Sequence, residues 1–446
     1  MMDIKDKKVL VLGFSKSGIS AAKCLKSLGA DVYITESKDE TPDDREKIDE
    51  VVNLGINLEF GGHSDEFIKN SEFAVTSPGI PPKSEIMQRL KSENIDVISE
   101  IELAYLNTDK PFVAITGTNG KTTTTALTAH ILSAKYNAIP CGNYGKPPCD
   151  LLSDDLDYFV CECSSFQLEY SKTFMPEISV FTNLTPDHID WHGGIEKYFE
   201  AKAKIFKNPK YSVLNGKDER LLELSKTAGG KVFLFDTETG ENCSYIKNDA
   251  IYYKEDGKEE LVITLKDCPL IGNHNYQNVM CAVISAKLEG IETSVIRERI
   301  MSFKVPEHRL ERFAENGKTV FYNDSKATNP EASLVAINSF NDCDVCLIAG
   351  GRDKNTDLKE FCESINKHIK TVILIGEAAD RFDENLKMNG FENIIREETF
   401  ESAVDKSIAL SPDVVLLSPA CASFDMFSGY EERGKVFKEY VLSKIN

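Results

Sequence analysis

The sequence predicts an α/β protein with mostly parallel sheets, divided into three domains. Two observations lead to this fold class. Short runs of β-branched residues alternate with helical patterns from one end of the chain to the other, which is typical of parallel strands joined by helical crossovers. A chain of 446 residues is also too long for one ordinary core, because a domain usually holds ~150 residues.

Two proline-bearing joints divide the chain. The first, residues 107–111, leads into a new strand predicted at Phe112–Ile115. The second, residues 305–309, follows two predicted helices at Asn278–Gly290 and Thr293–Met301. Joints of this kind are typical of domain boundaries. We therefore predict three domains, of residues 1–106, 107–305 and 306–446.

The composition indicates a folded protein of the cytoplasm. Hydrophobic residues make up 41% of the chain and charged residues 28%, as in ordinary globular domains. The formal net charge of -20 argues against a nucleic-acid partner, because phosphate backbones are bound by clustered lysine and arginine. The apolar run Val9–Leu12 is too short for a signal peptide or a membrane span. Twelve cysteines scattered through apolar stretches fit a reducing compartment, so we expect a cytoplasmic protein without a membrane partner.

The N-terminal residues predict a Rossmann-like unit of strand, helix and strand, at Lys8–Gly13, Ser17–Leu28 and Asp31–Thr35. The first turn carries Ser15 where a second glycine would let a pyrophosphate approach. Glu36 ends the second strand, where such units place a carboxylate that binds ribose. This unit alone leaves two interpretations open, a site for a nucleotide-like ligand and a scaffold without a ligand.

The strongest local signal is the segment Thr116–Thr123, between a predicted strand and a predicted helix. Backbone amides of such a loop, at the positive end of a helix, bind phosphates. We expect Lys121 to reach the β and γ oxygens of ATP and the Thr122 hydroxyl to bind Mg²⁺. Ile115 stands where the usual P-loop has its first glycine, so the segment matches a shorter variant. The sequence thus predicts a central P-loop ATPase domain, with a glycine turn that binds nothing as the alternative.

Two further positions offer groups for a metal ion. Glu162 lies in the apolar run Tyr158–Gln167, an unfavourable place for a carboxylate unless a cation pairs with it. We interpret it as a Mg²⁺ ligand, with a buried salt bridge as the alternative. His188 follows a strand predicted at Ile178–Phe181, and ligands bind at the carboxyl ends of parallel strands.

These residues, together with motifs further along the chain, resemble the Mur ligases. This family adds amino acids to the nucleotide-linked precursor of bacterial peptidoglycan, and folylpolyglutamate synthetases share its ATPase core. The resemblance covers the whole chain. The motifs that carry it are Gly117–Thr123, Glu162 with Ser164–Leu168, Asp187–His188, Ala201–Lys202, Gly272–Asn278, Pro306–Arg309, Asn323–Pro330, Gly350–Gly351 and Ser418–Asp425.

The segment Asp324–Asn329 resembles the members of the family that add D-glutamate, since other members carry a Tyr-x-His type sequence there. The resemblance implies an ATP-dependent ligase that joins D-glutamate to UDP-N-acetylmuramoyl-L-alanine through an acyl phosphate, in the cytoplasmic synthesis of peptidoglycan precursors. Binding a UDP-sugar in the first domain also fits Ser15 better than binding NAD does. We expect a Rossmann-like C-terminal domain and a monomer.

Lys202 is a special case, because an ammonium group beside a second Mg²⁺ would repel the ion. In the family this lysine is carbamylated by CO₂, which turns the cation into an anion that binds Mg²⁺ together with His188. The resemblance therefore implies a carbamate on Lys202. The alternative is a surface lysine on the amphipathic segment Tyr198–Phe206.

The resemblance implies roles for further positions. The implied catalytic residues are Lys121, Glu162, His188 and Lys202, and the implied metal ligands are Thr122, Glu162, His188 and Lys202. The residues implied to bind ATP are Thr118, Asn119, Gly120, Lys121, Thr122, Thr123, Thr124, Asn275, Asn278, Arg309 and Asp324. Those implied to bind the UDP-sugar are Lys16, Ser17, Glu36, Ser37, Ser77 and Asn143, and those near the amino acid or the transferred phosphoryl group are Lys326, Thr328, Lys354, Ser423 and Phe424.

Two other functions remain open at this point. One is a ligase for a different amino acid or a folylpolyglutamate synthetase, against which the Asp324–Asn329 segment argues. The other is a nucleotide-binding regulator that has lost catalysis. The joint presence of Lys121, Glu162, His188 and Lys202 argues against that regulator.

Overall fold

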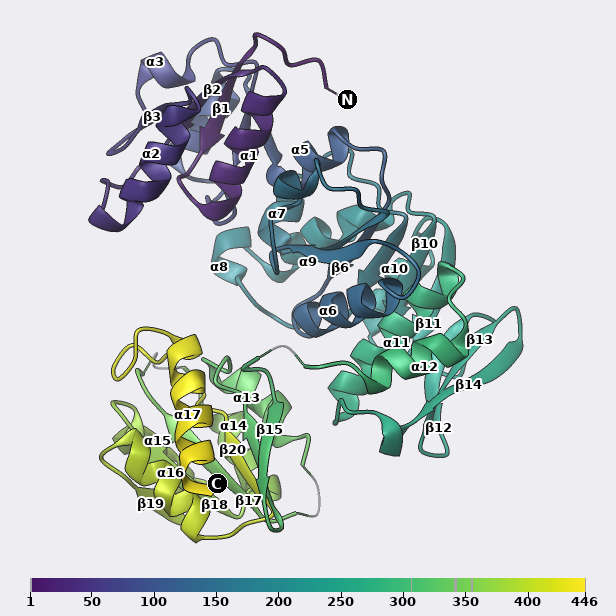
Figure 1. The fold of residues 1–446 in the computed structure, drawn as a ribbon, viewed down its shortest axis with the longest axis vertical. Helices are drawn as coiled ribbons and strands as arrows, with labels where there is room; N and C mark the ends of the chain where they lie inside the picture. The colour runs from purple at the N-terminus through teal and green to yellow at the C-terminus, as the bar shows by residue number, and fades with distance from the viewer. Residues whose placement is uncertain (1, 306, 341–342, 354–355, 446) are drawn as a thin grey trace. The chain divides into compact units, whose positions relative to one another are not determined.

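The structure is a computed structural model, and it describes residues 2–305, 307–340, 343–353 and 356–445 (Figure 1). The described chain contains three β-sheets. It divides into two compact units, which we call unit 1 (Met1–Pro269 with Asn275–Phe303) and unit 2 (Leu270–His274 with Lys304–Asn446). The predicted α/β class, with three mostly parallel sheets, is confirmed.

The first sheet of unit 1 is fully parallel, in the order β3-β2-β1-β4-β5. The strand order reverses between β1 and β4, so their carboxyl ends form the crevice where sheets of this kind bind ligands. The elements are β1 (Lys8–Leu12), α1 (Lys16–Ser27), β2 (Asp31–Thr35), α2 (Arg45–Asn53), β3 (Asn57–Glu59), α3 (Asp65–Ile68), β4 (Phe73–Thr76), α4 (Glu85–Ser92), β5 (Asp96–Ser99) and α5 (Glu100–Leu106).

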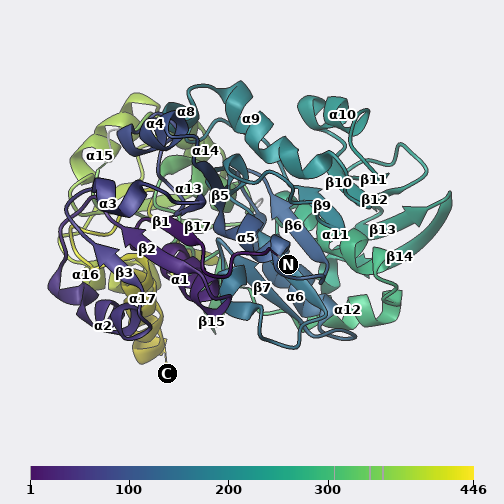
Figure 2. The same ribbon diagram turned by 90° about the horizontal axis from the view of Figure 1, so that it is seen from above.

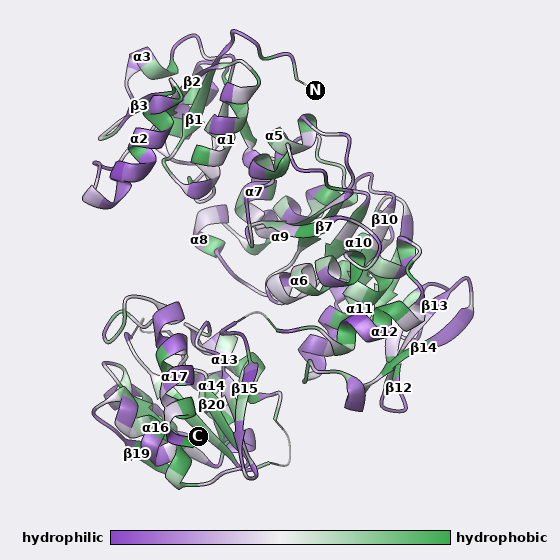
Figure 3. Cartoon of the chain, in the orientation of Figure 1, coloured by the Kyte–Doolittle hydropathy of each residue, from purple (hydrophilic) through white to green (hydrophobic). Residues whose placement is uncertain are grey.

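The strands of this sheet form because their side chains are apolar on both faces. Val9 and Val11 of β1 point into one core cluster, whereas Leu10 and Leu12 point into the other. A strand covered on both faces reads as a continuous hydrophobic run, because helical crossovers pack on each side of a parallel sheet. Figure 3 shows the same pattern, with hydrophobic strands and hydrophilic residues on the outer helices.

The central sheet of unit 1 has the order β14-β13-β12-β11-β10-β9-β6-β8-β7. It is parallel from β7 to β12, and β12, β13 and β14 form an antiparallel end that Figure 2 shows beside α12. Its strands are β6 (Phe112–Thr116), β7 (Ala138–Gly142), β8 (Tyr158–Glu162), β9 (Ile178–Phe181), β10 (Tyr211–Asn215), β11 (Lys231–Phe235), β12 (Cys243–Lys247), β13 (Ala250–Glu255) and β14 (Lys258–Thr264). The helices are α6 (Lys121–Leu132), α7 (Ser165–Glu169), α8 (Ile189–His192), α9 (Ile195–Ala203), α10 (Glu219–Ser225), α11 (Asn273–Leu288) and α12 (Thr293–Met301).

Unit 2 contains the third sheet, in the order β15-β16-β20-β17-β18-β19, with only the edge pair β15 and β16 antiparallel among its described strands. Helices cover both faces, and two core clusters lie on the two sides of the sheet. The elements are β15 (Glu311–Asn316), β16 (Thr319–Asn323), α13 (Pro330–Ile337), β17 (Val345–Gly350), α14 (Lys359–His368), β18 (Thr371–Ile375), α15 (Ala379–Met388), β19 (Ile394–Arg396), α16 (Phe400–Ala409), β20 (Val414–Leu417) and α17 (Tyr430–Ile445).

The sequence also predicts a helix that begins at Ser423, after a strand at Asp413–Leu417, and a hairpin over residues 245–266, and both predictions need correction. Ser423 does not begin a helix: turns and bends follow β20, and the next helix is α17, which begins at Tyr430. The expected hairpin at residues 245–266 does turn at Asp256 and Gly257, but a third strand, β12, joins it to the central sheet. None of the helices in the described chain is both long enough and apolar enough to cross a membrane.

Candidate active site

The loop between β6 and α6 has two positions that only glycine fits. Gly117 has a φ of 144°, and an added Cβ would lie 1.9 Å from Oγ1 of Thr182. Gly120 has a φ of 82°, and an added Cβ would lie 2.3 Å from Oδ1 of Asn278. Other residues strongly disfavour these conformations. The glycines therefore let the backbone pass close to β9 and α11 before α6 begins at Lys121.

Asn183, which follows β9, holds this loop in shape. The backbone N–H of Thr118 donates to the Asn183 carbonyl (2.9 Å), and the N–H of Asn119 donates to Asn183 Oδ1 (2.9 Å). Two of the amides that we expected to hold phosphates are thus bonded within the protein. The positive end of α6 remains the feature of this loop that attracts an anion. Sequence reasoning did not single out Asn183, although it lies in the same segment as His188.

Two lysines share one carbonyl of the loop. Nζ of Lys121 donates to the carbonyls of Gly117 (2.9 Å) and Thr118 (2.7 Å), and Nζ of Lys202 donates to Gly117 O (2.7 Å) and Thr116 Oγ1 (3.3 Å). The Lys202 side chain comes from α9 and is 1% exposed, so it is no surface lysine. Burial, and then the nearby charge of Lys121, lower the pKa of Lys202 well below its usual value. This environment favours a neutral, nucleophilic amine.

Glu162 ends β8 beside the loop and is 2% exposed. Its Oε1 accepts a hydrogen bond from Nδ2 of Asn143 (2.7 Å), and its Oε2 is buried with no hydrogen-bond partner among the described residues. The buried salt bridge that we considered as the alternative is not found, since Glu162 forms no ion pair within 4.0 Å in the described chain. An unsatisfied buried carboxylate oxygen is costly unless a cation reaches it. The site therefore fits a metal ion.

His188 lies on a more open part of the site. Its backbone is left-handed (φ 51°), its side chain is 50% exposed, and its ring lies 4.7 Å from that of Phe166. Nε2 is 3.4 Å from Oδ2 of Asp187. Within the described residues, no group of three or more His, Cys, Asp and Glu side chains is close enough to hold a metal ion. A Mg²⁺ ion at Glu162 would therefore need oxygen ligands from water or a bound phosphate, as is usual for this ion.

Three residues near Lys202 were not predicted from the sequence. His192 is buried, and its Nε2 lies 2.9 Å from Ser165 Oγ. Burial lowers the pKa of His192 to about 4, so this imidazole is neutral. The Tyr198 ring lies 4.7 Å from Nζ of Lys202, and Nε1 of Trp191 donates to the carbonyl of Gly79 (3.0 Å). The spacing of His188 and His192, four residues apart, was the signal that could have identified the second histidine.

The two asparagines predicted for the adenine side lie on α11 next to the loop. Asn275 and Asn278 are both buried, and Nδ2 of Asn278 donates to Oδ1 of Asn275 (3.2 Å). Oδ1 of Asn278 accepts from Oγ1 of Thr124 (3.1 Å), a residue of α6. The structure therefore brings these predicted residues together with Gly120.

The turn after β1 gathers three of the polar residues in the first sheet. Oγ of Ser15 donates to Oγ of Ser77 (2.7 Å), which donates in turn to the carbonyl of Gly13 (3.2 Å). The Glu36 carboxylate accepts from the backbone N–H of Phe14 (2.9 Å). Burial opposes ionisation of Glu36, but hydrogen bonds from backbone amides outweigh it and lower its pKa. These groups lie at the crevice between β1 and β4, where a ligand is expected.

The other residues predicted for the UDP-sugar are spread more widely. Ser37 is exposed and donates to Oε1 of Glu36 (3.2 Å), and Nζ of Lys16 donates to the carbonyl of Gly145 (2.7 Å). Ser17 is half-buried in α1. Asn143 contacts Glu162, so the structure places it beside that carboxylate and not with the other residues predicted for the UDP-sugar.

In unit 2, Asp324 lies at the carboxyl end of β16 and is 8% exposed. Its Oδ2 accepts from Oγ of Ser418 (2.7 Å), and its Oδ1 accepts from the backbone N–H of Leu310 (3.0 Å). Burial raises the pKa of Asp324 to about 7, against the opposing effect of these hydrogen bonds. Nearby charge from Arg309 also favours the ionised form. Burial therefore favours the protonated form of the Asp324 carboxyl group.

The residues predicted for the amino acid surround the same edge of the unit 2 sheet. Nζ of Lys326 lies 5.4 Å from the centre of the Tyr430 ring, and Thr328 is half-buried. Ser423 is buried, whereas Phe424 is 62% exposed, which is unusual for a phenylalanine. Lys354 lies outside the described residues.

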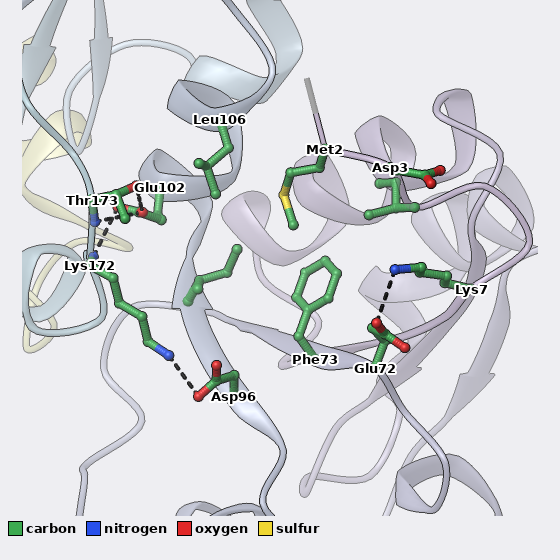
Figure 4. Close-up of a pocket in the computed structure, with 12 residues that line it drawn as sticks. Met2, Asp3, Lys7, Glu72, Phe73, Asp96, Glu102, Leu106, Lys172 and Thr173 are labelled. Atoms are coloured by element: carbon green, nitrogen blue, oxygen red, sulfur yellow. Dashed lines mark hydrogen bonds and ion pairs between the residues drawn. The ribbon is translucent and has the colours of Figure 1, made fainter.

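A cavity of about 370 Å³ lies at the other edge of the first sheet, at the amino ends of β1, β4 and β5 (Figure 4). Phe73 forms part of its apolar wall. Lys7 pairs with Glu72 (3.0 Å) and Lys172 pairs with Asp96 (2.8 Å), so both lysines of its wall are already neutralised. None of the predicted site residues lines this cavity.

Comparison with known proteins finds relatives along the whole chain. Three families match: the Mur ligase MurD-like, N-terminal domain at residues 7–99, the Mur ligase middle domain at residues 115–286, and the Mur ligase, glutamate ligase domain at residues 308–421. The UDP-N-acetylmuramoylalanine–D-glutamate ligase of Thermoanaerobacter pseudethanolicus is 40% identical over 451 residues, which cover 99% of both chains.

Solved structures share the fold at lower identity. MurF from Acinetobacter baumannii has a TM-score of 0.62 at 16% identity, and the match covers 98% of this chain and 94% of that one. The UDP-N-acetylmuramate-alanine ligase MurC from Thermotoga maritima has a TM-score of 0.58 at 20% identity, covering 98% of this chain and 99% of that one.

Proposed function

The chain belongs to the Mur ligase family, and from this premise we propose that it is the ATP-dependent ligase that adds D-glutamate to UDP-N-acetylmuramoyl-L-alanine. The reaction forms an amide bond and releases ADP and phosphate, and it belongs to the synthesis of peptidoglycan precursors. The relatives that are 40% identical over the full length carry this activity in their names.

One observation from the structure supports the proposed function. The loop of Gly117 and Gly120, the buried carboxylate of Glu162 and the buried amine of Lys202 lie together at the carboxyl end of the central sheet. A helix N-terminus, a lysine and a carboxylate suited to a metal ion are the parts that phosphoryl transfer requires.

The proposed reaction begins with attack of the substrate carboxylate on the γ-phosphate of ATP, which gives an acyl phosphate and ADP. The loop and the positive end of α6 hold the phosphates, and Lys121 neutralises charge on the transferred group. The amine of D-glutamate then attacks the acyl carbon and displaces phosphate. The chain's own contribution is to position these groups and to keep water away from the acyl phosphate.

The residues fit a Mg²⁺ ion, because Glu162 presents a buried oxygen without a partner. Thr122 and Glu162 are the proposed ligands of a first ion, and His188 with a carbamate on Lys202 those of a second; the ions would supply charge neutralisation at the phosphates. We further propose that Lys202 carries a carbamate. Its burial and the nearby Lys121 favour the neutral amine, which is the form that reacts with CO₂.

Further roles remain part of the proposal. Asn275 and Asn278 would contact the adenine side, and Glu36 and Ser77 the UDP-sugar. Residues of unit 2, including Asp324, would complete the nucleotide and amino-acid sites. We place the domains at residues 1–106, 107–305 and 306–446 and propose a monomer that works in the cytoplasm.

Release of inorganic phosphate tests the proposed function. The purified chain is mixed with ATP, Mg²⁺, UDP-N-acetylmuramoyl-L-alanine and D-glutamate, and each component is left out in turn. We expect phosphate release only when all are present, together with a product whose mass equals that of the two joined substrates. Release that is equally fast with another amino acid in place of D-glutamate would redirect the assignment within the family.

A further inference from the structure

Arg433 is a fully buried cation in the second turn of α17, with 0% exposure. Burial lowers its pKa to about 10, which still leaves the guanidinium group charged at neutral pH. Arginine is almost never buried without a charged partner, because removing its charge from water is costly. An ordinary role in the core does not account for this side chain.

The partners of Arg433 are all neutral. Nε donates to Oγ of Ser325 (3.0 Å), and Nη2 donates to the carbonyls of Ser325 (2.9 Å) and Cys421 (3.1 Å). Nη1 is buried with no hydrogen-bond partner in the described part of the chain. No carboxylate oxygen of the described residues lies within 4.0 Å of the guanidinium group. The carboxylates of Asp425 and Asp324 lie further away and favour the charged form, so among the described residues the guanidinium group has negative charge nearby but no ion-pair partner in direct contact.

The guanidinium group lies beneath the carboxyl ends of three neighbouring parallel strands. Ser325 follows β16, and Cys421 follows β20. Gly351 follows β17, and a Cβ added to it would lie 3.3 Å from Nη1 of Arg433. Backbone hydrogen bonds from Gly350 to Pro419 (2.8 Å) and from Arg352 to Ala422 (2.8 Å) join the last two loops to each other.

Two of these three loops carry described residues that are proposed for the amino acid. Lys326 and Thr328 belong to the first, and Ser423 and Phe424 belong to the second. Ligands of parallel sheets bind at this edge. D-glutamate brings two carboxylates to it, so a buried guanidinium group that lacks an ion-pair partner in direct contact can attract the substrate electrostatically from below the loops.

We propose that Arg433 is a positioning residue for the anionic amino acid: it holds the three loops together and gives this edge of the sheet a fixed positive potential. The inference rests on the proposed function, since it takes D-glutamate as the substrate. Arg433 acts through Ser325 and the loop carbonyls rather than by touching the reacting atoms. An isolated charge acts over several ångströms in a medium of low dielectric constant, so direct contact is not required.

Two substitutions separate the charge of Arg433 from its hydrogen bonds. Arg433→Gln keeps neutral donors for the Ser325 and Cys421 carbonyls but removes the charge, whereas Arg433→Lys keeps the charge with fewer donors. We expect Arg433→Gln to raise the KM for D-glutamate by roughly tenfold to thirtyfold, and Arg433→Lys to raise it by about threefold or less. The KM for ATP should change by less than about twofold in both variants.

Lys438→Met is the matched control, because it removes a cation from the same helix that is already paired with Glu307 (3.0 Å) and Glu311 (2.8 Å). We expect its KM for D-glutamate to stay within about twofold of the unmodified protein. Melting temperatures of all variants show whether each is folded.

The proposal is overturned if Arg433→Gln and Arg433→Lys raise the KM for D-glutamate equally, or if both lower kcat and leave that KM unchanged. Should Arg433→Gln fail to fold, Arg433→Lys decides alone. A wild-type KM for D-glutamate in Arg433→Lys supports the role of the positive charge, and a KM raised roughly tenfold contradicts it. Failure of the proposed function is a separate result, because the unmodified protein would then release no phosphate in response to D-glutamate.

Discussion

Beneath the carboxyl ends of the central sheet in unit 1 and of the sheet in unit 2, a basic and an acidic side chain are buried, but the two sheets treat these charges in opposite ways. In unit 1 the pKa of Lys202 is lowered well below its usual value, and Glu162 keeps a carboxylate oxygen without a partner. In unit 2 the pKa of Asp324 is raised to about 7, and Arg433 keeps a guanidinium nitrogen without a partner.

This difference determines which charge the carboxyl edge of each sheet offers to a ligand. Lysine loses its proton when it is buried beside another cation, whereas arginine does not. Unit 1 therefore presents an acid with a neutralised base, which suits a divalent cation. Unit 2 presents a base with a partly neutralised acid, which suits an anion. The proposed Mg²⁺ and D-glutamate sites follow this division.

The largest loss of activity is expected when unit 1 is given a cation that cannot lose its proton. Lys202→Arg should lower kcat by roughly a thousandfold, because the guanidinium can neither become neutral nor carry a carbamate. Phosphate release measures this. Lys202→Ala should be as inactive but regain part of its activity with added acetate, and wild-type turnover in Lys202→Arg would refute the role of the neutral amine.

A second substitution removes the acid of unit 1. Glu162→Gln should lower kcat by about a hundredfold and raise the Mg²⁺ concentration needed for half-maximal rate. Its melting temperature should not fall, because a buried carboxylate oxygen without a partner is replaced by a neutral amide. Glu177→Gln, which changes an acid paired with Lys210 (2.6 Å) at the start of β9, serves as the control. A Mg²⁺ requirement unchanged in Glu162→Gln would count against the proposed metal ligand.

The acid of unit 2 predicts a pH dependence of stability. A carboxyl group with a raised pKa binds its proton more tightly in the folded state, so its contribution falls as pH rises from about 4 to about 7 and is constant above. Asp324→Asn lacks this dependence. Relative to the unmodified protein, the variant should gain up to about 4 kcal/mol of unfolding free energy between pH 4 and pH 8. Urea unfolding at the two pH values measures the gain, and equal differences at both would show that Asp324 has an ordinary pKa.

The smallest effect should come from the hydroxyl group that Asp324 contacts. Ser418→Ala removes a donor to Oδ2 of Asp324, so the ionised carboxylate is less well stabilised. We expect a loss of about 1 kcal/mol at pH 8 and a smaller loss at pH 5, where the carboxyl group is protonated. The same urea unfolding series measures both values. A larger loss at pH 5 than at pH 8 would contradict the assigned direction.

The parts of the molecule set by local patterns were predictable from the sequence. The strands β1, β2, β6 and β9 were placed within a residue or two at each end, because continuous apolar runs bounded by turns identify buried parallel strands. The loop of Gly117 and Gly120 was found for the same reason, since its glycines and its lysine lie within five residues of each other.

The parts set by contacts between distant segments were not predictable. Arg433 contacts Ser325, and Ser418 contacts Asp324, each across about a hundred residues of chain. No spacing in the sequence predicts those contacts. The helix that was predicted to begin at Ser423 is not found, and the cause is different: a serine after a strand is a common helix N-cap, but here its carbonyl accepts from the amides of Met426 and Phe427 in a turn.

Trp191 is the single tryptophan of the chain, and its indole N–H donates to the carbonyl of Gly79, in the turn that follows Ser77. Light emitted by an indole changes in colour and intensity with its hydrogen bonding and its exposure to water. All tryptophan emission of this protein therefore comes from the place where the turn after β4 meets α8. The chain thus carries its own optical probe of that junction, and no label has to be attached to follow it.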